Sequence, residues 1–107
     1  MQNDFIMRII EQFVQVIQTI ARRRQEGKYQ EALQLIDQTC RSFLRTPLHI
    51  LPFCDPEEIL ETLDREHYAL VEDLLQELLL IKEATQQQEG VQQIKTLCAL
   101  LRQKQTE

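Results

Sequence analysis

Apolar residues recur at intervals of three and four along most of this sequence, and only two glycines interrupt the pattern. Such spacing places the apolar side chains on one face of an α-helix. The clearest interruption is Gly27, which follows Arg22, Arg23 and Arg24. A glycine just past the last turn can close a helix in the left-handed conformation, and cations in that turn suit the helix dipole. The sequence therefore predicts a tight bend at Gly27 between two antiparallel helices.

The same periodicity predicts the remaining elements. We expect one all-α domain over residues 1–107, made of two antiparallel helical hairpins joined by a short helix. The expected helices are 3–26 and 28–45 in the first hairpin, 65–88 and 91–104 in the second, and 55–64 between them. The two-residue alternation of a half-buried strand is absent.

Helix-end signals support three of these boundaries. Asp55-Pro56 followed by two glutamates predicts a helix start, because Asp caps free amides, Pro fits the first turn, and acids favour the positive end of the dipole. Asn3 or Asp4 is expected to cap the first helix. Gly90 is expected to end the fourth helix.

The first predicted helix carries a heptad-like apolar set. Its spacing alternates four and three, which suits either packing within the domain or a seam with a helix of a second chain. Only two heptads are present, so packing within the domain is the favoured interpretation. The candidate interaction surface comprises Ile6, Ile10, Phe13, Ile17 and Ile20.

Charge is distributed unevenly along the chain. Residues 1–54 carry seven basic and five acidic side chains, a net +2, whereas residues 55–107 carry five and twelve, a net −7. The overall charge of −5 disfavours general binding to nucleic acid or to an anionic membrane. Arg22, Arg23, Arg24 and Lys28 form the one basic cluster, for which helix-end complementarity is the favoured interpretation and a contact with nucleic acid or another anionic ligand the alternative.

Signals for catalysis or for a bound cofactor are weak. His49, Cys54 and His67 lack the spacing of a metal site, and no orienting acid or oxyanion-hole pattern accompanies Cys54 with His49. We expect no catalytic residue, no metal and no cofactor. Three cysteines (Cys40, Cys54 and Cys98), without a signal peptide or a long apolar run, favour reduced thiols in a cytoplasmic protein that contacts no membrane.

The bend also carries a family resemblance. Glu26-Gly27-Lys28-Tyr29-Gln30-Glu31-Ala32-Leu33, with Ile36 and Thr39 following, resembles the second half of a tetratricopeptide (TPR) repeat. Together with residues 4–11 and Asp55-Pro56-Glu57, it is similar to a small uncharacterised bacterial family with a TPR-like fold. That resemblance implies a TPR-like pair of hairpins and brings no established activity. A second Glu-Gly bend at Gly90 lacks the aromatic and the alanine that follow the first.

Helical-repeat units bury their faces against neighbours, and a chain this short leaves terminal faces to cover. We therefore expect a non-enzymatic protein-interaction module that forms a homodimer, binds another protein as an adaptor, or both. The alternative is a nucleic-acid or anionic-ligand-binding regulator that uses the basic cluster.

Overall fold

The computed structural model describes residues 2–107, with side-chain environments from residue 4 onward, and within that range it is all-α with no strand. Two short 3₁₀ turns, η1 and η2, accompany five α-helices. In chain order the elements are α1 (Gln2–Gln25), α2 (Tyr29–Phe43), η1 (Leu51–Phe53), α3 (Pro56–Thr62), η2 (Arg65–His67), α4 (Tyr68–Ala84) and α5 (Val91–Gln105).

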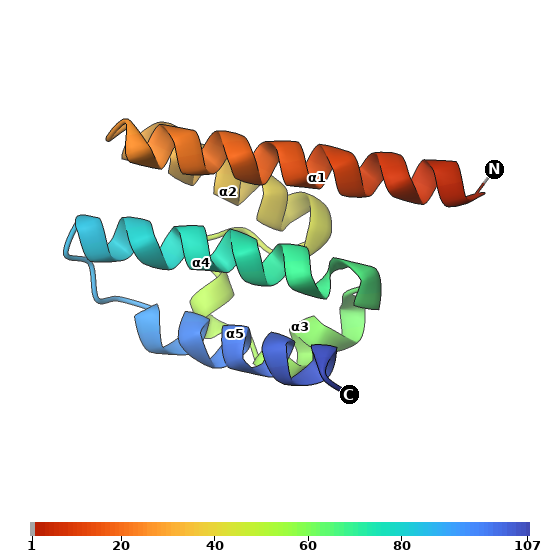
Figure 1. Ribbon diagram of the computed structural model, residues 1–107. Helices are drawn as coiled ribbons and strands as arrows, with labels where there is room; N and C mark the ends of the chain where they lie inside the picture. Colours follow the sequence, from red (N-terminus) through yellow and green to blue (C-terminus); the bar gives the residue numbers. More distant parts are fainter. Residues whose placement is uncertain (1) are drawn as a thin grey trace.

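The helices form three layers with α4 in the middle (Figure 1). Helices α1 and α2 pack together on one side of α4, and both contact it. On the other side α5 lies along α4, and α3 and η1 pack against α5. The long first helix therefore lies in an outer layer, and its own partner in that layer is the much shorter α2.

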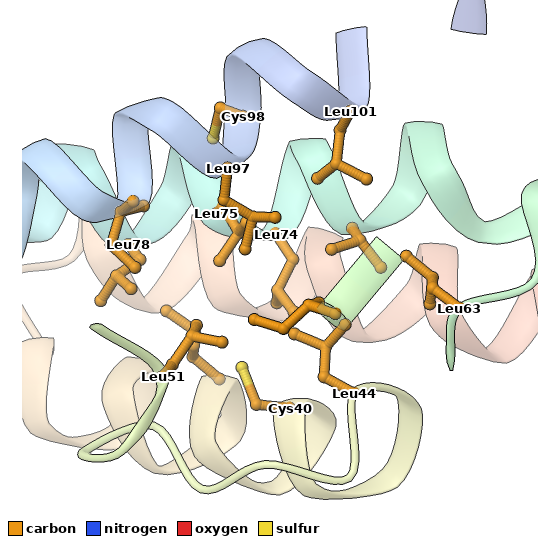
Figure 2. Close-up of a cluster of buried hydrophobic side chains, with 14 of the residues drawn as sticks. Cys40, Leu44, Leu51, Leu63, Leu74, Leu75, Leu78, Leu97, Cys98 and Leu101 are labelled. Carbon is orange, nitrogen blue, oxygen red and sulfur yellow. The ribbon is translucent and has the colours of Figure 1, made fainter. Parts of the chain in front are cut away.

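The core gathers around α4 because its apolar residues cover more than one face. Leu74, Leu75 and Leu78 point into the cluster shown in Figure 2, where they meet side chains from α2, α5 and the segment around Leu51. Five α4 residues are at most 1% exposed, so this helix contributes to both interlayer contacts. They are Val71, Leu74, Leu75, Leu78 and Ile81.

The structure confirms the bend at Gly27. Gly27 has a φ of +78°, and the amides of Gly27 and Lys28 donate to the carbonyls of Arg24 and Arg23 at 3.0 and 2.8 Å. These bonds satisfy carbonyls that the end of α1 would otherwise leave free. The chain then enters α2 at Tyr29, and Ala32 is fully buried at the start of this second helix.

The start of α3 is also as predicted. The Asp55 side chain accepts a hydrogen bond from the Glu57 amide at 3.1 Å, and Pro56 occupies the first helical position. Helix α3 ends at Thr62, two residues before the predicted end, while Leu63 turns into the core beyond it.

The prediction of Asp4 as the cap of the first helix is wrong. Helix α1 begins at Gln2, so Asp4 lies within its first turn, where a carboxylate still favours the dipole. The side chain of Asn3, the other candidate, lies outside the described part of the structure.

The predicted bounds of the fourth helix are wrong at both ends. Residues Arg65–His67 form η2 and the α-helix begins only at Tyr68. Helix α4 ends at Ala84, because Gln86 adopts a left-handed φ of +57° and the Gln87 amide then donates to the Lys82 carbonyl at 2.8 Å. Gly90, expected to end this helix, instead precedes α5 with a φ of +76°.

The two glycines give a matched test of packing around the second bend. A Cβ added to Gly90 would lie 2.9 Å from Cγ of Pro52, whereas a Cβ on Gly27 would meet nothing within 4 Å. Gly27→Ala should cost about 1–2 kcal/mol from backbone strain alone. Gly90→Ala should cost more, because the Pro52 ring must also move. Urea denaturation of both variants measures the difference, and equal losses would show that the Pro52 contact yields freely.

Candidate interaction surface

Helix α1 is longer than the elements that cover it. It has 24 residues and α2 has 15, so their lengths of about 36 Å and about 22 Å cannot match. The two helices meet tightly at Gly27, and the mismatch therefore falls at the other end. Figure 1 shows the N-terminal end of α1 extending past α2 and α4.

An aromatic cluster marks the point on α1 beyond which α2 and α4 no longer cover it. The rings of Phe13 and Phe43 are 4.2 Å apart between centroids, and His67 lies 5.2 Å from Phe43 and 6.3 Å from Phe13. Phe43 is the last residue of α2 and His67 immediately precedes α4. Both covering helices thus end at the level of Phe13. We call residues 4–12, which lie beyond it, the overhang.

The overhang exposes large apolar side chains. Phe5, Ile6 and Met7 are 66%, 40% and 53% exposed, and Ile9 and Ile10 are partly exposed. Ile6, Ile9 and Ile10 lie one or two turns before Phe13 on its side of the helix. The overhang therefore continues the core-facing stripe of α1 into solvent.

The structure divides the predicted heptad set in two. Phe13 and Ile20 are at most 1% exposed within the chain's own core, and Ile17 packs against that core. For these three residues the favoured interpretation, packing within the domain, is confirmed, and their place in the candidate interaction surface is corrected, because α2 and α4 cover them. Ile6 and Ile10 remain accessible in the overhang. Phe5 and Met7, which lie outside the heptad spacing, are exposed there as well.

The basic cluster is partly neutralised within the chain. The Arg24 Nε lies 2.6 Å from a Glu77 carboxylate oxygen of α4, and Arg23 pairs with Glu26 at 3.4 Å. Arg22 and Lys28 are exposed. A nucleic-acid or anionic-ligand role for the cluster stays a prediction, and two of its four charges are engaged in the fold.

A second feature, which sequence reasoning missed, is a hollow of about 410 Å³ between two loops. Its apolar wall comes from α2, α4 and the segment between α2 and α3. Phe53 on that segment is 79% exposed. The available signal was an apolar-rich stretch, Leu48 to Phe53, where a polar loop would be usual. The apolar lining residues are Leu33, Leu48, Pro52, Phe53 and Leu78.

Both loops around the hollow are held by single side chains. Asp37 of α2 accepts from the Leu48 amide at 2.8 Å, and Lys82 of α4 donates to the Glu89 carbonyl at 2.9 Å. The Leu48 hydrogen bond, with help from the Arg41 guanidinium, holds the pKa of Asp37 below its usual 3.8. Lys82 and Glu89 form no ion pair within the described residues, so their charges remain available at the rim.

The cysteines and histidines form no evident reactive site. Burial raises the pKa of Cys40 to about 12 and that of Cys98 to about 11, so both thiols stay protonated. Cys54 is partly exposed and its Sγ lies 3.6 Å from the Ile50 carbonyl oxygen. No group of three or more ligand-type side chains in residues 2–107 could hold a metal ion.

No family model, curated protein or solved structure matches this chain. Among the described residues, no helix has the length and apolar character needed to cross a membrane.

The Asp37 tether predicts an acid-dependent loss of stability. Its folded pKa lies below the ordinary 3.8, so its contribution is complete above that value, declines below it, and vanishes once the pH passes the folded pKa. Asp37→Asn should lower stability at pH 7 by about 1 kcal/mol through the loss of charged hydrogen bonds. Urea denaturation should show the difference from wild type shrinking between pH 5 and pH 2. A constant difference would contradict the assignment.

Thiol reactivity should follow burial. In the folded protein at pH 8, a thiol reagent such as Ellman's reagent should modify Cys54 rapidly, and Cys40 and Cys98 only after urea is added. Cys54→Ser should abolish the rapid phase. Rapid modification of two thiols in the native protein would show that a buried cysteine becomes exposed by local opening.

Proposed function

We propose that this chain is a non-enzymatic protein-interaction module, that it associates with itself through the overhang, and that its helices follow a TPR-like plan. The observation that carries the proposal is the run Phe5, Ile6 and Met7, exposed at the helix tip where neither α2 nor α4 reaches. Burying one such side chain in an interface contributes about 1.5–3 kcal/mol. Two contacting helix pairs, α1 with α2 and α4 with α5, support the TPR-like plan.

The charges of the overhang favour a protein over a lipid surface as its partner. Asp4, Arg8 and Glu11 give a net charge of −1. Amphipathic helices that lie on membranes carry a polar face rich in Lys and Arg, because they bind anionic lipids. Binding to a protein, whether a second copy of the chain or another partner, does not require such a basic face.

Substitution of the overhang tests the proposal. The double variant Phe5→Gln/Ile6→Gln should keep α1 helical, since Gln is a good helix former, and should weaken self-association by at least about tenfold. Size-exclusion chromatography with light scattering over a concentration series measures this, and far-UV circular dichroism checks the helices.

The chain offers a matched control for this variant. Leu80 of α4 is 41% exposed, close to the 40% of Ile6, but lies away from the overhang. Leu80→Gln should leave the association unchanged. Wild-type protein that stays monomeric at every concentration, or equal effects of the two variants, would remove the proposal.

A further inference from the structure

The overhang presents its apolar side chains on one face and its charges on the other. An α-helix turns by about 100° per residue, so Ile6, Ile9 and Ile10 lie within about 60° of Phe13 around the helix axis. On the same count, the three charged residues lie at least about 140° from Phe13. They are Asp4, Arg8 and Glu11. Two overhangs that meet through their apolar faces therefore bring no like charges of the overhangs together.

The apolar face stays open because the rest of the domain stops short of it. Helix α2 ends at Phe43, and the chain enters α4 through His67. Their two rings contact each other in the aromatic cluster with Phe13, and both side chains are only partly buried. An aromatic surface thus lies at the base of the overhang, where the overhang leaves the rest of the domain (Figure 1).

Antiparallel pairing of two overhangs covers both features at once. When two copies of residues 4–12 lie side by side in opposite directions, each tip reaches the base of the other, because both segments are about 14 Å long. Phe5 and Ile6 at the tip of one copy then lie against the aromatic cluster of the other. The apolar face and the aromatic surface are therefore complementary parts of one shape that two copies share.

We infer that two copies form a closed dimer through this reciprocal contact, with each tip packed against the partner's aromatic cluster. The inference rests on the proposed self-association and adds its geometry and its receiving surface. An isologous contact uses the same surface on both copies, so assembly stops at two. A helix about 14 Å long and about 10 Å wide offers less than the roughly 800 Å² per partner of a standard interface, so the dimer is weak and concentration-dependent.

The hollow at the other end of the molecule is the competing receiving site for a partner's overhang. Its lining carries both signs of charge, from Asp37, Lys82 and Glu89, and so favours no particular partner. His49 lines the hollow, whereas His67 belongs to the aromatic cluster. The chain has only these two histidines, so each one reports on one of the two sites.

Proton NMR of the imidazole rings distinguishes the two sites in the unmodified protein. The variant His49→Gln assigns the signals by removing one set. Spectra are recorded at constant pH over a concentration series up to about 1 mM, a range that populates weak complexes. The His67 signals should shift as the concentration rises, because the partner's tip arrives beside that ring, and the His49 signals should stay constant. In Phe5→Gln/Ile6→Gln neither set should shift.

Cysteine cross-linking tests the antiparallel geometry. In a Cys54→Ser background, where Cys40 and Cys98 are buried, Ile9→Cys places a thiol on the apolar face near the two-fold axis. Arg8→Cys places a thiol at nearly the same level on the charged face and is the matched control. With a mild oxidant, Ile9→Cys should form a disulfide-linked dimer at least about tenfold faster than Arg8→Cys, because only facing thiols come within disulfide range.

The outcomes separate this inference from the proposed function. Concentration-dependent shifts of His49 instead of His67 would assign the contact to the hollow and overturn the inference, while self-association through the overhang stands. Constant signals from both histidines in a protein whose mass grows with concentration would overturn it as well. So would equal cross-linking of the two cysteine variants, or assemblies larger than a dimer. A wild type that is monomeric at every concentration overturns both proposals.

Discussion

The fold depends on the burial of α4 from two sides. Its apolar residues Leu74, Leu75 and Leu78 are at most 1% exposed, and the helix contacts α1, α2 and α5. A helix that is apolar over more than one face must be covered on each of them. The α1–α2 pair and the α5–α3 group provide that cover, so the three-layer arrangement follows from one sequence segment.

The points at which α2 ends and α4 begins also determine which part of α1 stays uncovered. Both end at the level of Phe13, where Phe43 and His67 complete an aromatic contact. The apolar stripe of α1 continues for two further turns in the same register. Exposed apolar side chains in line with a core are more informative than scattered ones, because the helix already presents them as a packing face. The overhang is therefore a structural consequence of unequal helix lengths.

The sequence predicted what local rules determine and missed what tertiary contacts determine. Periodicity located all five α-helices, and the Asp55 cap and the Gly27 bend follow from residue chemistry over a few positions. The end of α4 was missed because Gln86 takes a left-handed conformation that is ordinarily expected of glycine. The heptad set was treated as one surface, since spacing alone cannot tell which turns of α1 other helices cover. The hollow was missed because its walls combine α2 and α4 with two loops that only tertiary contacts bring together.

The hollow shows how loop geometry is specified by residues that a motif search ignores. Asp37 holds one loop through the Leu48 amide, Lys82 holds the other through the Glu89 carbonyl, and Pro52 packs where Gly90 leaves no Cβ. Each contact joins segments that are distant in sequence or bonds to main chain. The carboxylate of Asp37 has a partner at each oxygen, because the Arg41 guanidinium bonds to one and the Leu48 amide to the other. Lys82 uses only one of its three N–H donors, so it can shape the rim and still offer charge to a partner.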